Sequence, residues 1–251
     1  MTTNLRTSDL RTRRSGETGA SLPSRPEAVG DRTVVAVRLV GGAVALWALL
    51  SVLGLAVTHL VGTGLLYDRD RGVDDWLARH RSGLWNTITQ FGSGVANTQT
   101  AIAVTVIAVL FLRWRLGRWY ESWIVVAAIT GELLVFLAVT ATVHRPRPPV
   151  QRLDVSPQTS SFPSGHTAAA VALYGCLAIL LLWVYGRRPW TLVAATVLWL
   201  VPVVVGASRL YRGMHYPSDV LVGALGGGLW LLIVITTLLP RQRRNRGALR
   251  A

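Results

Sequence analysis

Side chains that could bind and transfer a phosphoryl group gather in three short segments of the chain, residues 144–149, 161–167 and 208–219. Each segment carries histidine, arginine or serine and adjoins a long apolar run. Polar residues beside apolar runs of membrane-spanning length are candidates for functional sites. If the three segments face the same side of a membrane, their side chains can converge on one oxyanion.

The second segment contains Ser164-Gly165-His166 at the predicted start of an apolar helix. The first N–H groups of a helix have no intrahelical acceptor, and the helix dipole favours an anion there. Gly165 would let a ligand approach the backbone closely, and Ser164 adds a hydroxyl donor. This segment predicts an oxyanion cradle with His166 beside it, although helix capping alone would also explain it.

Arginines in the first and third segments supply further donors. The planar guanidinium groups of Arg145, Arg147 and Arg209 suit the oxygens of a phosphate. Contact with lipid headgroups is the alternative interpretation, and it applies most directly to Arg145 and Arg212.

His215 and Asp219 are four residues apart in the third segment. A carboxylate at that spacing can accept from one imidazole nitrogen and leave the other nucleophilic, although a lone His–Asp pair is often structural. His215 could then attack phosphorus, while His166 protonates the leaving oxygen and water hydrolyses the phosphohistidine. Since no carboxylate cluster accompanies these residues, the chemistry is expected to need neither a metal ion nor another cofactor.

The three segments together resemble the signature of the type-2 phosphatidic acid phosphatase superfamily. This superfamily includes lipid phosphate phosphatases, undecaprenyl-diphosphate phosphatases and vanadium haloperoxidases. Its pattern is Lys-x6-Arg-Pro, Pro-Ser-Gly-His and Ser-Arg-x5-His-x3-Asp. The matching residues are Arg147-Pro148, Pro163-Ser164-Gly165-His166, and Ser208-Arg209 with His215 and Asp219.

The resemblance implies that His215 is the nucleophile, Asp219 its orienting partner and His166 the general acid. It also implies a phosphate site made of Arg147, Ser164, Gly165 and Arg209. The departure is Thr140, which stands seven residues before Arg147 where the family has lysine. A Thr140 hydroxyl could still bind phosphate but lacks the positive charge, which Arg145 could supply instead.

The elements that must position these residues are membrane helices. Of the 251 residues, 51% are apolar, and the mean hydropathy is positive. In lipid, a spanning segment satisfies its backbone groups internally, so each apolar run is expected to be a helix. An all-α polytopic membrane domain over residues 34–239 is predicted. Its six spans are expected at 34–61, 98–113, 122–143, 166–185, 190–207 and 218–239.

Arginine placement predicts the orientation of these spans. The chain has 26 Arg and no Lys, and 17 of the arginines fall in the two tails and the loops of one side. By the positive-inside rule, both termini are cytoplasmic and the site lies on the outer face, in a bacterial plasma membrane. Residues 1–33 are expected to be a disordered cytoplasmic tail and residues 240–251 a basic cytoplasmic tail. The net charge of +14 is explained by this placement rather than by nucleic-acid binding.

Three features stand outside the site motifs. The first outer loop, residues 62–97, has apolar residues at helical spacing, which predicts an interfacial helix with a packing role or a role as a lid. Glu132 lies within a span, where local pairing or a water-facing position is expected. Gly223, Gly226, Gly227 and Gly228 indicate close helix packing.

The leading functional hypothesis is hydrolysis of a lipid phosphomonoester or diphosphate, with the lipid and the bilayer as partners. A vanadate-dependent haloperoxidase would share the oxyanion site, but those relatives are typically soluble. A non-catalytic lipid-phosphate binding or transport protein is the third possibility, and Thr140 is the feature that favours it. No sequence feature indicates an oligomeric state.

Overall fold

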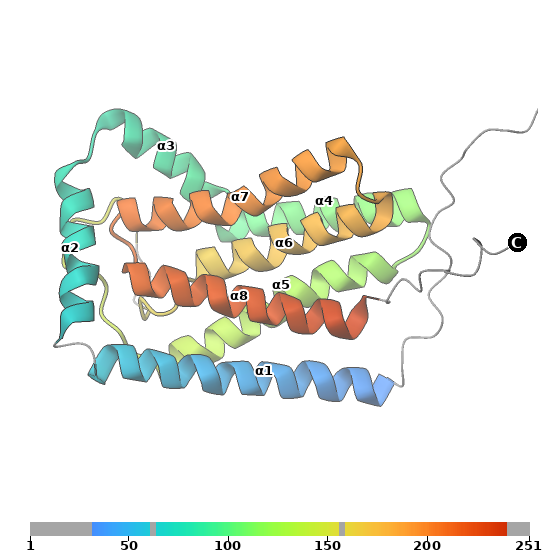
Figure 1. The fold of residues 1–251 in the computed structure, drawn as a ribbon, viewed down its shortest axis with the longest axis horizontal. Helices are drawn as coiled ribbons and strands as arrows, with labels where there is room; N and C mark the ends of the chain where they lie inside the picture. Colours follow the sequence, from blue (N-terminus) through green and yellow to red (C-terminus); the bar gives the residue numbers. More distant parts are fainter. Residues whose placement is uncertain (1–31, 61–63, 156–158, 240–251) are drawn as a thin grey trace, which may run out of the picture.

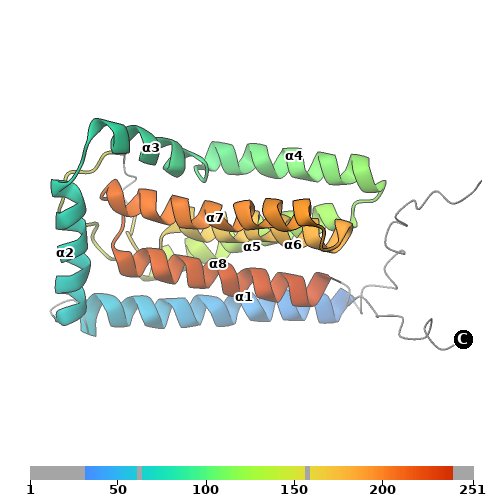
Figure 2. The same cartoon turned by 45° about the horizontal axis from the view of Figure 1, so that its top comes forward.

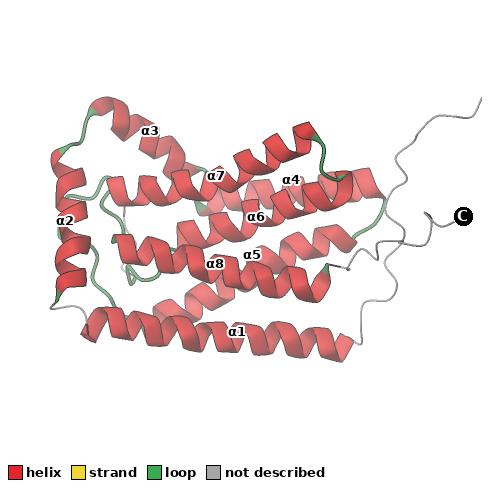
Figure 3. Ribbon diagram, in the orientation of Figure 1, coloured by secondary structure: helices red, strands yellow, loops and turns green. Residues whose placement is uncertain are grey.

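The computed structural model describes residues 32–60, 64–155 and 159–239, and within these ranges the chain forms helices and no strands (Figure 3). Six helices are long and apolar enough to cross a membrane, so the predicted all-α fold with six spans is confirmed. The helices are α1 (Arg32–Leu55, continued by the π-helix Ala56–Leu60), α2 (Leu65–Arg79), α3 (Gly83–Gly94), α4 (Thr98–Leu116), α5 (Tyr120–Thr142), α6 (Gly165–Tyr185), α7 (Pro189–Tyr211) and α8 (Pro217–Leu238). The predicted tails lie outside the described residues, except for Arg32 and Thr33 in α1.

The six long helices run roughly along one axis, and α2 lies across one end of them (Figures 1 and 2). The start of α1 and the end of α8 lie together at the opposite end (Figure 1). The loops that carry the three site segments are therefore at the α2 end, which agrees with the alternation of spans expected from the sequence. The arginine pattern remains the basis for predicting which end faces the cytoplasm.

The first outer loop contains two helices where the sequence predicted one. The side chain of Ser82 accepts a hydrogen bond from Trp85 N (3.4 Å) and begins α3 after a break at Arg81. Asn97 similarly caps α4 by accepting from Thr100 N at 2.8 Å. These side-chain caps satisfy N–H groups at each helix start, so they separate α2, α3 and α4 into distinct elements.

The buried face of α2 is acidic rather than apolar. Asp70 and Asp74 are buried, whereas Trp76 of α2 and Trp85 of α3 are about half exposed, at 53% each. An apolar side facing outward suits the predicted interfacial position, which stays a prediction. Asp70 holds α2 to the bundle through Arg145 and Ser218, whereas neither carboxylate oxygen of Asp74 has a hydrogen-bond partner among the described residues.

Glycines of α8 allow it to pack closely against α6 and α1, as the sequence predicted. A Cβ atom at Gly223 would lie 2.6 Å from the carbonyl oxygen of Ser164, and one at Gly227 would collide with the backbone of Ala168. Gly226 faces Leu50 of α1, with the nearest carbon 2.9 Å from a built Cβ. The first of these contacts sets the start of α6 directly against α8, and both helix starts carry site residues.

Candidate active site

The three predicted site segments meet at the α2 end of the bundle. Backbone hydrogen bonds join Ser161 N to Arg145 O (2.9 Å) and Ser164 N to Asp219 O (3.0 Å). These bonds connect the loop after α5, the start of α6 and the start of α8. The convergence that the topology predicted is therefore present in the structure.

A cavity of about 490 Å³ opens beside these segments. At its polar end it is lined by His166, His215, Arg147, Arg209 and Gly165. Its remaining walls come mainly from apolar residues of α4 and α5. A ligand in this cavity would meet two imidazoles and two guanidinium groups at one end and an apolar surface beyond them.

The imidazole of His215 is buried, and its Nδ1 atom lies 2.7 Å from the carbonyl oxygen of Ser161. Because a carbonyl only accepts, Nδ1 carries the proton in this contact, which leaves Nε2 with a free lone pair. Burial lowers the pKa of His215 well below its usual range, and the charges of Arg209 and Arg147 lower it further. The ring is therefore held neutral and nucleophilic beside the cavity.

Asp219 lies near His215 but does not have the expected hydrogen bond to it. Its Oδ2 atom is 3.9 Å from His215 Nδ1 and accepts instead from Tyr216 N at 3.0 Å. Its Oδ1 atom forms an ion pair with Arg145. Since both carboxylate oxygens are already engaged, the carbonyl of Ser161 takes the orienting role that the sequence assigned to Asp219.

Arg147 and Arg209 both reach the cavity with an unpaired donor. Arg147 donates through Nη1 to Met214 O (2.7 Å), and Arg209 donates through Nη1 to Ser93 Oγ (2.8 Å). The Nε atoms of both arginines are buried and have no hydrogen-bond partner among the described residues. Burial also lowers the pKa of Arg147. Two guanidinium groups that line one cavity are arranged to bind an anion there.

Asp154, in the loop before α6, positions two of the site arginines and was not identified from the sequence. It accepts from Arg209 Nη1 (2.9 Å) and from Arg212 Nε (2.8 Å). Burial opposes ionisation of Asp154, but Arg212, Arg209 and His166 lower its pKa overall. Its only sequence signal is an acid between two arginine-rich segments, which does not distinguish it from a solvated loop residue.

Asp70 of α2 is the second residue that sequence analysis missed. It accepts from Arg145 Nη2 (3.0 Å) and from Ser218 N (3.2 Å), and all three residues are buried. Arg145 therefore bridges Asp70 and Asp219, and it also lies 4.2 Å from the ring centroid of Tyr216. With both carboxylates as partners, Arg145 is neither a lipid-headgroup contact nor a free substitute for the family lysine.

Arg212 is likewise held by the protein rather than by lipid. It is buried and donates to Asp154, to Asn86 O (3.1 Å) and to Leu153 O (3.0 Å). The headgroup interpretation is therefore wrong for Arg212 as well as for Arg145.

The start of α6 contributes its backbone to the site. Gly165 and His166 line the cavity, and a Cβ atom at Gly165 would lie 2.7 Å from Cε2 of Phe136. Ser164 is the helix N-cap, is fully buried, and its hydroxyl pairs with Thr167 Oγ1 at 2.9 Å. Ser164 is thus next to the site, with its hydroxyl already occupied.

Thr140 is not among the cavity-lining residues, and its hydroxyl donates to Leu137 O of its own helix at 3.0 Å. Its predicted role in phosphate binding gains no support from this geometry. Among the described residues, no group of three or more His, Cys, Asp or Glu side chains is placed to hold a metal ion.

Comparisons with known proteins agree with the motif pattern. The family profile described as the PAP2 superfamily matches residues 121–243. The chain is 35% identical over 114 residues to the bacitracin transport permease protein BcrC of Bacillus licheniformis, covering 45% of this chain and 51% of that protein. It is 31% identical over 150 residues to the undecaprenyl-diphosphatase BcrC of Bacillus subtilis, covering 57% of this chain and 70% of that protein.

The fold is also similar to a solved structure. A PAP2-type phosphatidylglycerolphosphate phosphatase from Bacillus subtilis superposes with a TM-score of 0.68 and 22% identity, covering 80% of this chain and 98% of the other. The chain spans about half the length of the first relative and over two thirds of the second. The motifs, the six helices and these similarities together establish that this integral membrane protein belongs to the PAP2 superfamily.

Proposed function

We propose that this chain is a membrane-embedded phosphatase that hydrolyses lipid phosphates or diphosphates through a phosphohistidine on His215, without a metal ion. The observation that carries the proposal is that the guanidinium groups of Arg147 and Arg209 line one cavity together with the neutral His215. Two guanidinium groups provide charge-assisted donors for the oxygens of a phosphate, and the imidazole beside them provides a nucleophile.

The residues provide a balanced two-step reaction. Nε2 of His215 attacks phosphorus and forms the P–N bond as the P–O bond to the lipid breaks, and His166 gives its proton to the leaving oxygen. Water then attacks phosphorus, the P–N bond breaks, and His166 takes the proton from the water. Arg147, Arg209 and the N–H groups at the start of α6 stabilise the charge on the remaining phosphoryl oxygens.

The cavity supports a lipid substrate rather than a water-soluble one. Its apolar walls extend from the polar end along α4 and α5, both of which are membrane-spanning helices. A headgroup bound at the arginines would place its tail against those walls. The relative named undecaprenyl-diphosphatase is consistent with such a substrate.

Phosphate release from lipid phosphates in detergent, with a chelator present, tests the proposal. We expect release by the wild type, loss of release in His215→Ala, and a large decrease in His166→Ala. His80→Ala is a matched control, because His80 is exposed at the C-terminal end of α2 and its ring hydrogen-bonds Trp76 O of that helix. Rapid quenching should trap an acid-labile phosphoenzyme in the wild type and none in His215→Ala. Activity that disappears with chelator would contradict the metal-free mechanism.

The relative named a transport permease favours a second candidate, a lipid-phosphate binding or transport protein. The same assay separates the two functions. A wild type that binds lipid phosphates but releases no phosphate from any of them would support binding or transport and exclude hydrolysis.

A further inference from the structure

Glu132 is an acidic side chain on the membrane-spanning helix α5, and it lines the active-site cavity together with His166, His215 and the two arginines. It is 4% exposed. Among the described residues, its carboxyl group has neither a hydrogen-bond partner nor an ion pair. The local pairing expected from the sequence is therefore absent in the described part of the chain.

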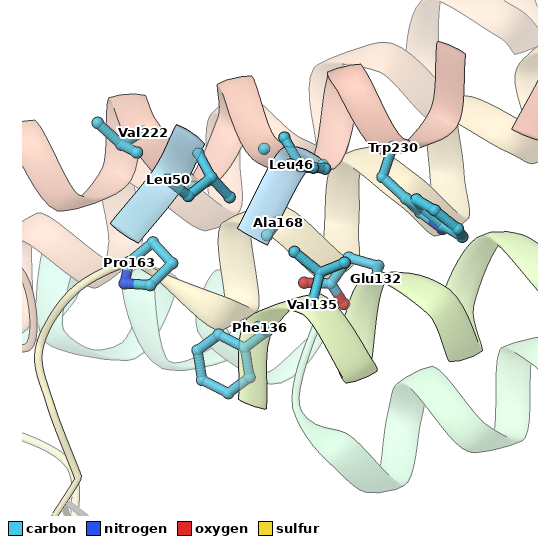
Figure 4. A pocket seen from close by; sticks show the side chains of 12 residues that line it. Leu46, Leu50, Glu132, Val135, Phe136, Pro163, Ala168, Val222 and Trp230 are labelled. Atoms are coloured by element: carbon cyan, nitrogen blue, oxygen red, sulfur yellow. The ribbon is translucent and has the colours of Figure 1, made fainter. Parts of the chain in front are cut away.

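The surroundings of Glu132 are apolar. Figure 4 shows its carboxyl oxygens beside a smaller hollow that is also lined by Val135, Phe136, Leu46 and Trp230. The indole N–H of Trp230 donates to Ala127 O and Ala128 O, so it is not available to the carboxyl group. An acid placed without a protein partner in such surroundings is costly, and a ligand group could remove that cost.

The position of Glu132 along α5 sets the depth at which it meets a ligand. Phe136 packs against Gly165, at the phosphate end of the cavity. Because α5 ends at the site, Glu132 lies four residues deeper, about 6 Å along the helix axis. Ala169, four residues past Gly165 in α6, lines the cavity at a similar depth. This depth corresponds to the junction between the phosphate of a lipid and its tail.

We infer that Glu132 recognises a polar group at the head–tail junction of the substrate, and that it selects glycerol-based lipid phosphomonoesters over polyprenyl diphosphates. The inference rests on the proposed phosphatase function. As a carboxylic acid, Glu132 donates to an ester carbonyl of a diacylglycerol phosphate such as phosphatidic acid. A polyprenyl chain offers no such group at this depth.

The charge of the ligand also favours glycerol-based phosphomonoesters over polyprenyl diphosphates. When the terminal phosphate of a diphosphate occupies the arginine end, its second phosphate lies one step deeper, toward Glu132. A charged phosphate group at that depth would lose its hydration among apolar walls and a neutral carboxyl group, which is costly. A phosphomonoester of glycerol places neutral oxygen functions there instead.

The test is the ratio of kcat/KM for phosphatidic acid to kcat/KM for a polyprenyl diphosphate, measured in the same detergent. We expect the ratio to exceed one in the wild type and to fall about tenfold or more in Glu132→Leu, since a tenfold change corresponds to a single hydrogen bond of ordinary strength. Glu132→Gln keeps a hydrogen-bond donor at the same place, so its ratio should fall less. Retained turnover of the diphosphate serves as the internal test of folding.

Thr105→Val is the matched control. Thr105 lines the same cavity, but its hydroxyl already donates to Ala101 O at 2.7 Å. Its removal should leave the ratio unchanged. Two results overturn the inference alone. One is an active wild type with a ratio below one, and the other is a ratio for Glu132→Leu equal to that for Glu132→Gln. A wild type that releases phosphate from neither lipid overturns the proposed function.

Discussion

The Nδ1 atom of His215 lies 2.7 Å from the carbonyl oxygen of Ser161, and this contact fixes the tautomer of the ring. The nearest oxygen of Asp219 is 3.9 Å from the same nitrogen. The carbonyl orients the imidazole, while burial and the charges of Arg209 and Arg147 favour its neutral form. Asp219 instead forms an ion pair with Arg145.

The lowered pKa of His215 predicts that the acid limb of the pH–rate profile lies at an unusually low pH. Burial, Arg209 and Arg147 all favour the neutral ring, which is the nucleophilic form. We expect kcat/KM to keep its value as pH falls through about 6.5, the ordinary imidazole pKa, and to decline only at lower pH. Arg147→Ala removes one of the lowering charges and should move that decline upward. A wild-type decline centred at or above 6.5 would contradict this account of His215.

Loss of either cavity arginine should reduce catalysis strongly. Arg147→Ala and Arg209→Ala each remove a guanidinium that would stabilise the transferring phosphoryl group, and we expect kcat/KM to fall by about 10²–10³. Lysine should rescue only part of this activity, because it lacks the planar donor pair. Arg152→Ala is the control, since Arg152 is exposed in the loop before α6. Equal activity of the Arg147 and Arg152 variants would exclude Arg147 from the site.

Asp70 is expected to position the site from α2. Asp70→Asn removes a charge from the buried pair with Arg145, which leaves Arg145 free to shift relative to Asp219. We expect kcat to fall about tenfold with little change in KM, because the cavity arginines remain in place. Asp68→Asn, on an exposed position of the same helix, should leave both constants unchanged. If both variants behave alike, α2 has no positioning role through Asp70.

The buried Asp74 predicts a stability that falls as pH rises. Burial, together with Asp70, Asp219 and Asp75, raises the pKa of Asp74 to about 8. Between about pH 4, its ordinary value, and pH 8, the folded protein holds a proton that the unfolded chain has released, so stability decreases through this window. Asp74→Asn should remove that pH dependence. The gain in free energy of unfolding of the variant over the wild type should therefore be larger at pH 8 than at pH 5, by about 1–2 kcal/mol.

Thermal unfolding in detergent at both pH values is the measurement for Asp74. Asp75→Asn is the control, because the side chain of Asp75 is 39% exposed and pairs with Arg71 on the same helix. The contrary result is that the melting temperatures of Asp74→Asn and the wild type differ by the same amount at pH 5 and at pH 8. That result would show that Asp74 does not titrate in this range.

The close contact of α8 with α6 predicts that Gly223→Ala destabilises the protein. The new Cβ would lie 2.6 Å from Ser164 O, so the helix starts must separate, at a cost of about 1–3 kcal/mol. Because Ser164 precedes the oxyanion cradle, activity should fall together with the melting temperature. Gly41→Ala in α1 meets no atom within 4 Å and should be neutral or slightly stabilising. Equal melting temperatures for the two variants would contradict the packing argument.

The helices and the convergence of the site segments were predictable from the sequence because both depend on local chemistry. Apolar runs of membrane-spanning length are helices, and the alternation of spans brings residues 144–149, 161–167 and 208–219 to one end. The motif residues His166, His215, Arg147 and Arg209 do line one cavity. The helix predicted within residues 62–97 is present as two helices, α2 and α3, which the cap at Ser82 divides, and its interfacial position stays a prediction.

The pairing of polar side chains was decided only by the tertiary structure. Ser161 rather than Asp219 accepts from His215, Asp70 and Asp154 hold the arginines, and Glu132 has no described partner. Each pairing depends on distances of a few tenths of an ångström between helices far apart in sequence, and spacing along the chain does not specify such distances. Motif spacing predicted the histidines and arginines that line the cavity but also Thr140, which lies outside it. The packing of the helices determines which side chains are already bonded and which remain available to a ligand.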